Sequence, residues 1–93
     1  MQTIIKNNII YELPDMIYII SGSHPATKGL ENTLFQVKAC NLFDIKNHPI
    51  FSIDYVLEKD ITKLTGGGWI EPEETIGLEY LTYEQFIQMK VFL

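Results

Sequence analysis

The sequence predicts an all-β or β-dominated domain that ends in a short helical turn, and three observations support this fold class. Apolar and polar side chains alternate along residues 35–40 and 51–57, which is the period of a half-buried strand. Clusters of Gly, Pro, Asn and Asp divide the chain into short segments. A chain of 93 residues, 46% of them hydrophobic and 12% aromatic, supplies one core, so we expect residues 1–93 to form a single domain.

The first apolar segment, residues 9–20, reads as one extended stretch or as two short strands. Pro14 cannot donate to a strand ladder, and the Pro14-Asp15 pair favours a turn. Residues 16–20 are then a buried strand. The polar residues 21–32, with a further turn at Lys28-Gly29, are expected to form a loop.

The two alternating segments are predicted to be strands that share a core. The side chains expected in or against that core are Tyr18, Phe51, Ile53 and Tyr55. Residues 41–49 contain turn-forming Asn, Asp and Pro, so they are predicted to be a connection. This connection is expected to contribute apolar side chains as well, namely Leu42, Phe43 and Ile45.

The next segment contains the three consecutive glycines. Residues 59–64 are compatible with a single helical turn or a loop. Gly66 to Gly68 have backbone freedom that other residues lack, and they are predicted to form a flexible or tightly bent loop. A short strand is expected at Trp69-Ile70 and the start of another at Thr75-Ile76.

The C-terminal segment carries a helix start signal. Thr82 is followed three residues later by Gln85, which is the spacing of a capping box, and residues 83–89 contain no Gly or Pro. The apolar residues do not form a clean stripe, so a strand stays open as the alternative to a helix.

The order of these segments resembles that of small SH3-like or KOW-like β-barrels. The resemblance covers residues 9–78 and is carried by residues 16–22, Lys28-Gly29, residues 51–57, and Gly68-Trp69-Ile70 followed by Glu73-Glu74. It implies a small barrel that works as a binding module. The KOW-like barrels that bind RNA are similar in outline but basic, and this chain departs from them in charge.

The charge balance disfavours direct binding of nucleic acid. The chain has seven lysines, no arginine and twelve acidic residues, for a net charge of -5. A nucleic-acid surface needs cations that neutralise phosphates, and arginine is the usual residue for base contacts.

Cysteine use and hydropathy favour a cytoplasmic protein that does not enter a membrane. Cys40 is the single cysteine, so the chain can form no internal disulfide and no Cys-rich zinc site. The first fifteen residues include Lys6, Glu12 and Asp15 and contain no apolar stretch long enough for a signal peptide.

His24 and His48 are the candidates for a catalytic or metal site centred on histidine, together with Asp44 or Asp54. They would support a small hydrolase only if a histidine and a carboxylate converged in a cleft. Each histidine precedes a proline, and the chain has no HExxH, CxxC or HxH spacing. The favoured interpretation is that both begin turns, so we expect no catalytic residue, metal or cofactor.

Acidic and aromatic residues alternate near the C-terminal end without an intervening cation. The predicted binding residues are Trp69, Glu71, Glu73, Glu74, Tyr80 and Tyr83. This segment is either a solvated edge or a partner site in which carboxylates steer a basic protein and aromatic side chains anchor it. Trp69 could instead close the core.

The predicted function is therefore a noncatalytic protein-binding module. The alternative is an inhibitor, of the mobile-element or phage type, of a nucleic-acid-binding enzyme. The sequence leaves the identity of the partner and the oligomeric state open.

Overall fold

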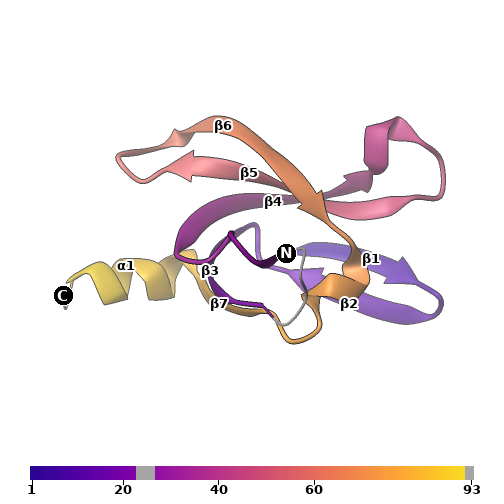
Figure 1. Ribbon diagram of the computed structural model, residues 1–93, viewed down its shortest axis with the longest axis horizontal. Coiled ribbons are helices and arrows are strands. Elements are labelled where there is room, and N and C mark those ends of the chain that lie inside the picture. Colours follow the sequence, from indigo (N-terminus) through magenta and orange to yellow (C-terminus); the bar gives the residue numbers. More distant parts are fainter. Residues whose placement is uncertain (23–26, 92–93) are drawn as a thin grey trace.

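The described part of the chain forms seven antiparallel strands and one C-terminal helix (Figure 1). The computed structural model describes residues 1–22 and 27–91, except for the side chain of Leu64. The strands are β1 (Gln2–Lys6), β2 (Ile9–Leu13), β3 (Met16–Ser21), β4 (Thr33–Asn41), β5 (Pro49–Leu57), β6 (Asp60–Ile70) and β7 (Glu79–Thr82). The helix is α1 (Tyr83–Val91), and two 3-10 turns are η2 (Leu42–Asp44) and η3 (Pro72–Thr75). The predicted β-dominated fold with a short C-terminal helix is confirmed.

The strands form a two-stranded sheet, β1-β2, and a five-stranded sheet in the order β6-β5-β4-β3-β7. Strands β6 and β7 are the two ends of the larger sheet. Within the described residues, backbone pairing therefore leaves this sheet open rather than closed into a ring.

The first hairpin depends on two adjacent asparagines. Asn7 and Asn8 both have positive φ, 52° and 63°, as a two-residue turn between paired antiparallel strands requires. Asparagine tolerates this conformation better than most residues. After β2, Pro14 and Asp15 separate two strands, which confirms the second of the two alternatives for residues 9–20.

The five-stranded sheet buries side chains on both of its faces. The main core unites one face of the sheet with the hairpin and contains Ile4, Tyr11, Leu13, Ile17, Ile19, Phe35, Val37, Phe51, Ile53 and Ile70. On the opposite face, Leu34 and Val56 pack with Phe86 of α1. Tyr18 joins this smaller cluster, with its ring 4.7 Å from that of Phe86.

The helix explains why the predicted burial pattern of β5 fails at the end of the strand. Phe51 and Ile53 are buried as expected. Val56 is buried under α1, whereas Tyr55 and Leu57 are 40% and 43% exposed. Tyr55 therefore lies against the core rather than in it, with its ring 4.9 Å from the buried ring of Phe35.

Two predictions about β6 are wrong. Residues 60–64 continue into a strand of eleven residues, and the glycines lie inside that strand rather than in a loop. Gly66 occupies a bulge, because Asp54 pairs with Gly67 and the next partner of β5, Tyr55, pairs with Thr65. A side chain on Gly67 would collide with the carbonyl oxygen of Ile53, so glycine permits a close approach of two backbones.

After β6, one element predicted from the sequence is absent and another is present. The predicted strand at Thr75-Ile76 is wrong, because η3 ends at Thr75 and β7 begins only at Glu79. The capping box is confirmed: the Thr82 amide donates to Gln85 Oε1 at 2.9 Å, and the Gln85 amide donates to Thr82 Oγ1 at 3.2 Å. Residues 83–91 are accordingly helical, and no described helix is both long and apolar enough to cross a bilayer.

Candidate binding site

Trp69 lies on the surface at the end of β6. It pairs with Ser52, and 44% of its surface is exposed. Its ring meets the ring of Phe43 edge to face, with the centroids 5.7 Å apart. The alternative in which Trp69 closes the core is therefore wrong.

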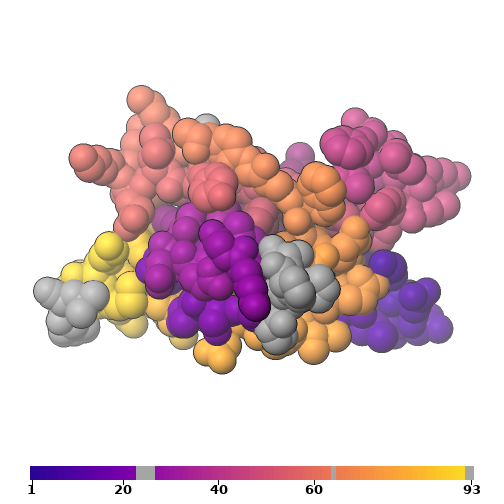
Figure 2. All heavy atoms as spheres, in the orientation of Figure 1, coloured from indigo at the N-terminus to yellow at the C-terminus, as the bar shows by residue number. Residues whose placement is uncertain are grey.

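Phe43 is the most exposed large apolar residue of the described chain, at 77%. It belongs to η2, and its φ of 50° lies in the left-handed region that bulky residues rarely adopt. Asp44 and Asn47 have positive φ as well. Figure 2 shows the turn after β4 as a projection at one end of the molecule. Ile45 is exposed as well, at 54%, so two of the apolar side chains expected from this connection lie on the surface.

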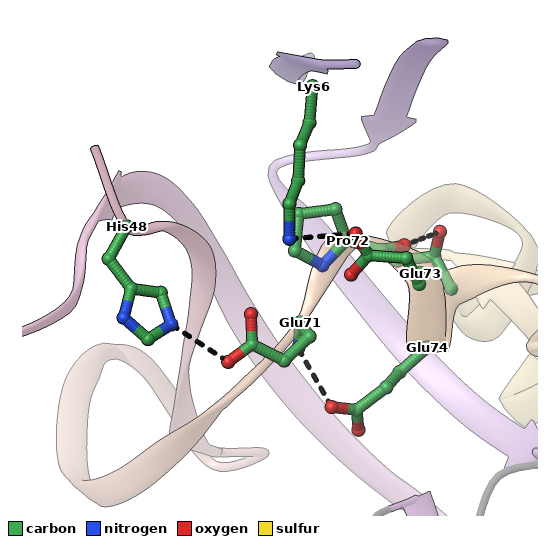
Figure 3. Close-up of polar contacts among 7 residues, drawn as sticks. Lys6, His48, Glu71, Pro72, Glu73 and Glu74 are labelled. Carbon is green, nitrogen blue, oxygen red and sulfur yellow. Dashed lines mark hydrogen bonds and ion pairs between the residues drawn. The ribbon is translucent and has the colours of Figure 1, made fainter.

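Two side chains from elsewhere in the chain contact the acidic turn η3 and its N-cap residue Glu71 (Figure 3). His48 Nε2 lies 3.0 Å from Glu71 Oε1, and Lys6 Nζ lies 2.7 Å from Glu73 Oε1. Glu74 Oε1 accepts a hydrogen bond from the Glu71 amide at 3.2 Å. Three of the predicted binding residues thus hold η3 in place.

The Lys6–Glu73 pair changes the ionisation of both groups. The hydrogen bond from Lys6 lowers the pKa of Glu73 below its ordinary value of 4.5. The same hydrogen bond raises the pKa of Lys6 above its ordinary value of 10.5. Both groups are therefore charged near neutral pH, and the carboxylate of Glu73 is already partnered within the chain.

Tyr80 and Tyr83 do not lie beside Trp69 as the prediction supposed. Tyr80 in β7 pairs with Ile19 and packs against the main core. Tyr83 opens α1 and packs against the smaller cluster under that helix. The six predicted residues are therefore split among three surroundings, and only Trp69 among the three aromatic residues is largely exposed.

The two histidines were candidates for a catalytic or metal site only if one of them met a carboxylate in a cleft. His24 lies outside the described residues. His48 contacts Glu71 rather than Asp44 or Asp54, and both partners are partly buried, with 41% and 31% of their side chains exposed. In residues 1–22 and 27–91, no group of three or more His, Cys, Asp or Glu side chains is arranged to hold a metal ion. Cys40 is a half-buried free thiol in β4.

A hollow of about 240 Å³ beside β6 was not foreseen from the sequence. It is lined by Leu30, Phe35, Ile53, Tyr55, Gly67, Gly68 and Trp69. The glycine run is the signal that could have indicated it, because a glycine inside a strand often marks a place where a ligand or another backbone approaches closely.

No protein-family model, curated protein or solved structure matches this chain. The resemblance to SH3-like and KOW-like barrels therefore stays a prediction. The case for a function depends on the geometry of the exposed residues.

Proposed function

We propose that the protein is a noncatalytic protein-binding module whose binding face centres on Phe43 and Trp69, called here the aromatic face. The observation that carries the proposal is Phe43, a bulky apolar residue that is 77% exposed on a left-handed backbone. Such a conformation costs on the order of 1–3 kcal/mol and is concentrated at functional sites.

The unbound protein gains little from Phe43. Its ring touches Trp69, which is itself exposed, and a polar residue such as asparagine would suit both the solvent and the positive φ. Large aromatic side chains that become buried on association are the residues that dominate binding energy in protein interfaces. The cost in the free protein is understandable if a partner covers the ring.

Charge favours a protein with basic residues as the partner. The chain carries a net charge of -5 and no arginine, which opposes binding to phosphates. Glu71 follows Trp69 by two residues, so a carboxylate lies at the rim of the aromatic face, where it steers association more than it adds affinity. His48 shares that carboxylate.

Affinity capture from a lysate of the source cells tests this proposal with matched variants. Phe43→Asn removes the anchor and places a residue that tolerates the left-handed backbone. Val91→Asn is the control, because Val91 is 73% exposed and α1 lies at the opposite end of the molecule (Figure 1). Thermal melts verify that both variants fold.

We expect wild type and Val91→Asn to retain the same protein, and Phe43→Asn to lose it while melting no lower than wild type. Retention by Phe43→Asn would refute the aromatic face. A captured enzyme that acts on nucleic acid would favour the inhibitor hypothesis over a general adaptor.

A further inference from the structure

We infer that the partner supplies an extended peptide of alternating apolar and basic residues, which adds as a strand to the edge of β6. One apolar side chain of this peptide enters the hollow beside Gly68. The inference rests on the proposed function, because the peptide is taken to be part of the partner protein that binds the aromatic face at Trp69.

The edge of β6 supplies main-chain hydrogen-bonding groups. In the described part of the chain, β6 pairs with β5 alone and is the terminal strand of its sheet. Every second residue of such a strand directs its amide and carbonyl away from the sheet, where an added strand can pair with them. An extended peptide is the ligand whose own amides and carbonyls can pair with these outward-facing groups of β6.

One half of the edge is protected and the other half is open. Lys63 and the bulge at Gly66 are devices that discourage strand pairing, and both lie in the first seven residues of β6. The remaining residues, 67–70, carry no charged side chain. The peptide is therefore expected to pair with residues 67–70.

The hollow lies beside this open half. Gly68 pairs with Ile53, so it shares the face of the sheet that carries Phe35 and Tyr55. No atom lies within 4 Å of where a side chain on Gly68 would begin. A volume of about 240 Å³ with walls of Phe35, Ile53 and Tyr55 has room for one large apolar side chain.

Asp54 provides the charge complementarity on the opposite face. It pairs with Gly67, which has no side chain to separate the Asp54 carboxylate from the edge of the sheet. Successive side chains of an added strand alternate between the two faces. The peptide residues on either side of the buried apolar one would therefore face Asp54 and Trp69. A Lys or Arg is favoured beside Asp54, and a further apolar side chain is favoured beside Trp69.

Random linear peptides displayed on phage, selected on the wild-type protein, test the inference. Dissociation constants of the enriched peptides are then measured for wild type, Gly68→Leu and Gln88→Leu. Gln88→Leu is the matched control, because it places the same side chain at an exposed position of α1, away from the edge of β6 and from Asp54. Gly68→Ala, a smaller change, serves if Gly68→Leu does not fold.

We expect enriched peptides to alternate apolar and basic residues and to protect the amides of residues 67–70 from hydrogen exchange. Gly68→Leu should weaken binding by about tenfold or more, a loss of about 1.4 kcal/mol, and Gln88→Leu should leave it unchanged. Asp54→Asn should weaken binding mainly at low salt.

Failure to enrich peptides, or equal affinity for wild type and both Gly68 variants, would overturn the inference. Concentration-dependent dimerisation that Gly68→Leu abolishes would also overturn it, since a second copy would then occupy the edge. In each case, capture from the lysate that still depends on Phe43 would leave the proposed function standing. Loss of that dependence would remove the proposed function instead.

Discussion

Gly67 and Gly68 are adjacent in the chain and have different surroundings. Gly67 lies against the backbone of Ile53 and has no room for a side chain. Gly68 faces open space and has no such restriction. Gly67 is thus required for the close approach of β6 to β5, whereas the lack of a side chain on Gly68 leaves space at the hollow.

Ile53 provides the test of the main core. It is 2% exposed and packs in the cluster that joins the larger sheet to the β1-β2 hairpin. Ile53→Ala is expected to lower the free energy of unfolding by about 2–4 kcal/mol, the usual range for such a change in a packed core. Urea denaturation measures this difference, and an unchanged midpoint and slope would show that Ile53 is not packed as described.

The Lys6–Glu73 pair gives the protein a predictable pH dependence. The pKa of Glu73 is lowered in the folded state. Its contribution to the free energy of unfolding is therefore complete above pH 4.5 and is lost as the pH falls through the lowered pKa. The pKa of Lys6 is raised in the folded state. Its contribution to the free energy of unfolding is therefore complete below pH 10.5 and is lost as the pH rises through the raised pKa.

Lys6→Met should therefore destabilise the protein slightly from about pH 4.5 to 10.5, and less on either side of that window. The difference in free energy of unfolding between wild type and variant, measured across pH, reports this directly. Lys59→Met, at an exposed position in the β5-β6 turn, is the control. A difference from wild type that stayed constant from acid to alkali would argue against the ion pair.

At the scale of elements, the capping box fixes where α1 begins. The side chain of Thr82 accepts from the Gln85 amide, which would otherwise lack a partner at the helix N-terminus. Thr82→Ala is expected to cost about 0.5–2 kcal/mol, whereas Thr82→Ser should keep most of the stability. Chemical denaturation measures the loss, and equal stability of the two variants would exclude a role for the cap.

Some elements could be predicted because their signals are local. The alternation in β4 and the first half of β5, the break at Pro14 and the Thr82–Gln85 spacing are all contained within a few residues. Strand β6 could not be predicted in this way, because its glycines have low strand propensity and are held by pairing with β5. Strand β1 and its pairing with β2 were not predicted, although Asn7-Asn8 was the signal for that hairpin.

At the scale of the whole molecule, the candidate site could be predicted only in part. Trp69 was singled out correctly as a surface residue by one of the two alternatives. Phe43 could be recognised only as an apolar residue of a connection, because whether such a residue is buried or exposed depends on the tertiary fold. Lys6 and His48 approach the acidic turn from distant parts of the chain, so the sequence of residues 71–84 alone overstated its free negative charge.

The two ends of the molecule differ, because one contains a helix packed on buried residues and the other contains exposed aromatic residues. Helix α1 covers the smaller cluster at one end, and the turn after β4 projects at the other (Figures 1 and 2). Substitutions in α1 should therefore affect stability without affecting binding. Substitutions at Phe43 should do the opposite.

The most direct test of the aromatic face places a photoreactive benzoylphenylalanine at position 43, with the same residue at position 91 as the control. Irradiation in a lysate of the source cells should join position 43, and not position 91, to a specific protein. Excess unlabelled wild type should compete for this product, and excess Phe43→Asn should not. Equal crosslinking from both positions, or competition by Phe43→Asn as effective as that by wild type, would contradict the proposed function.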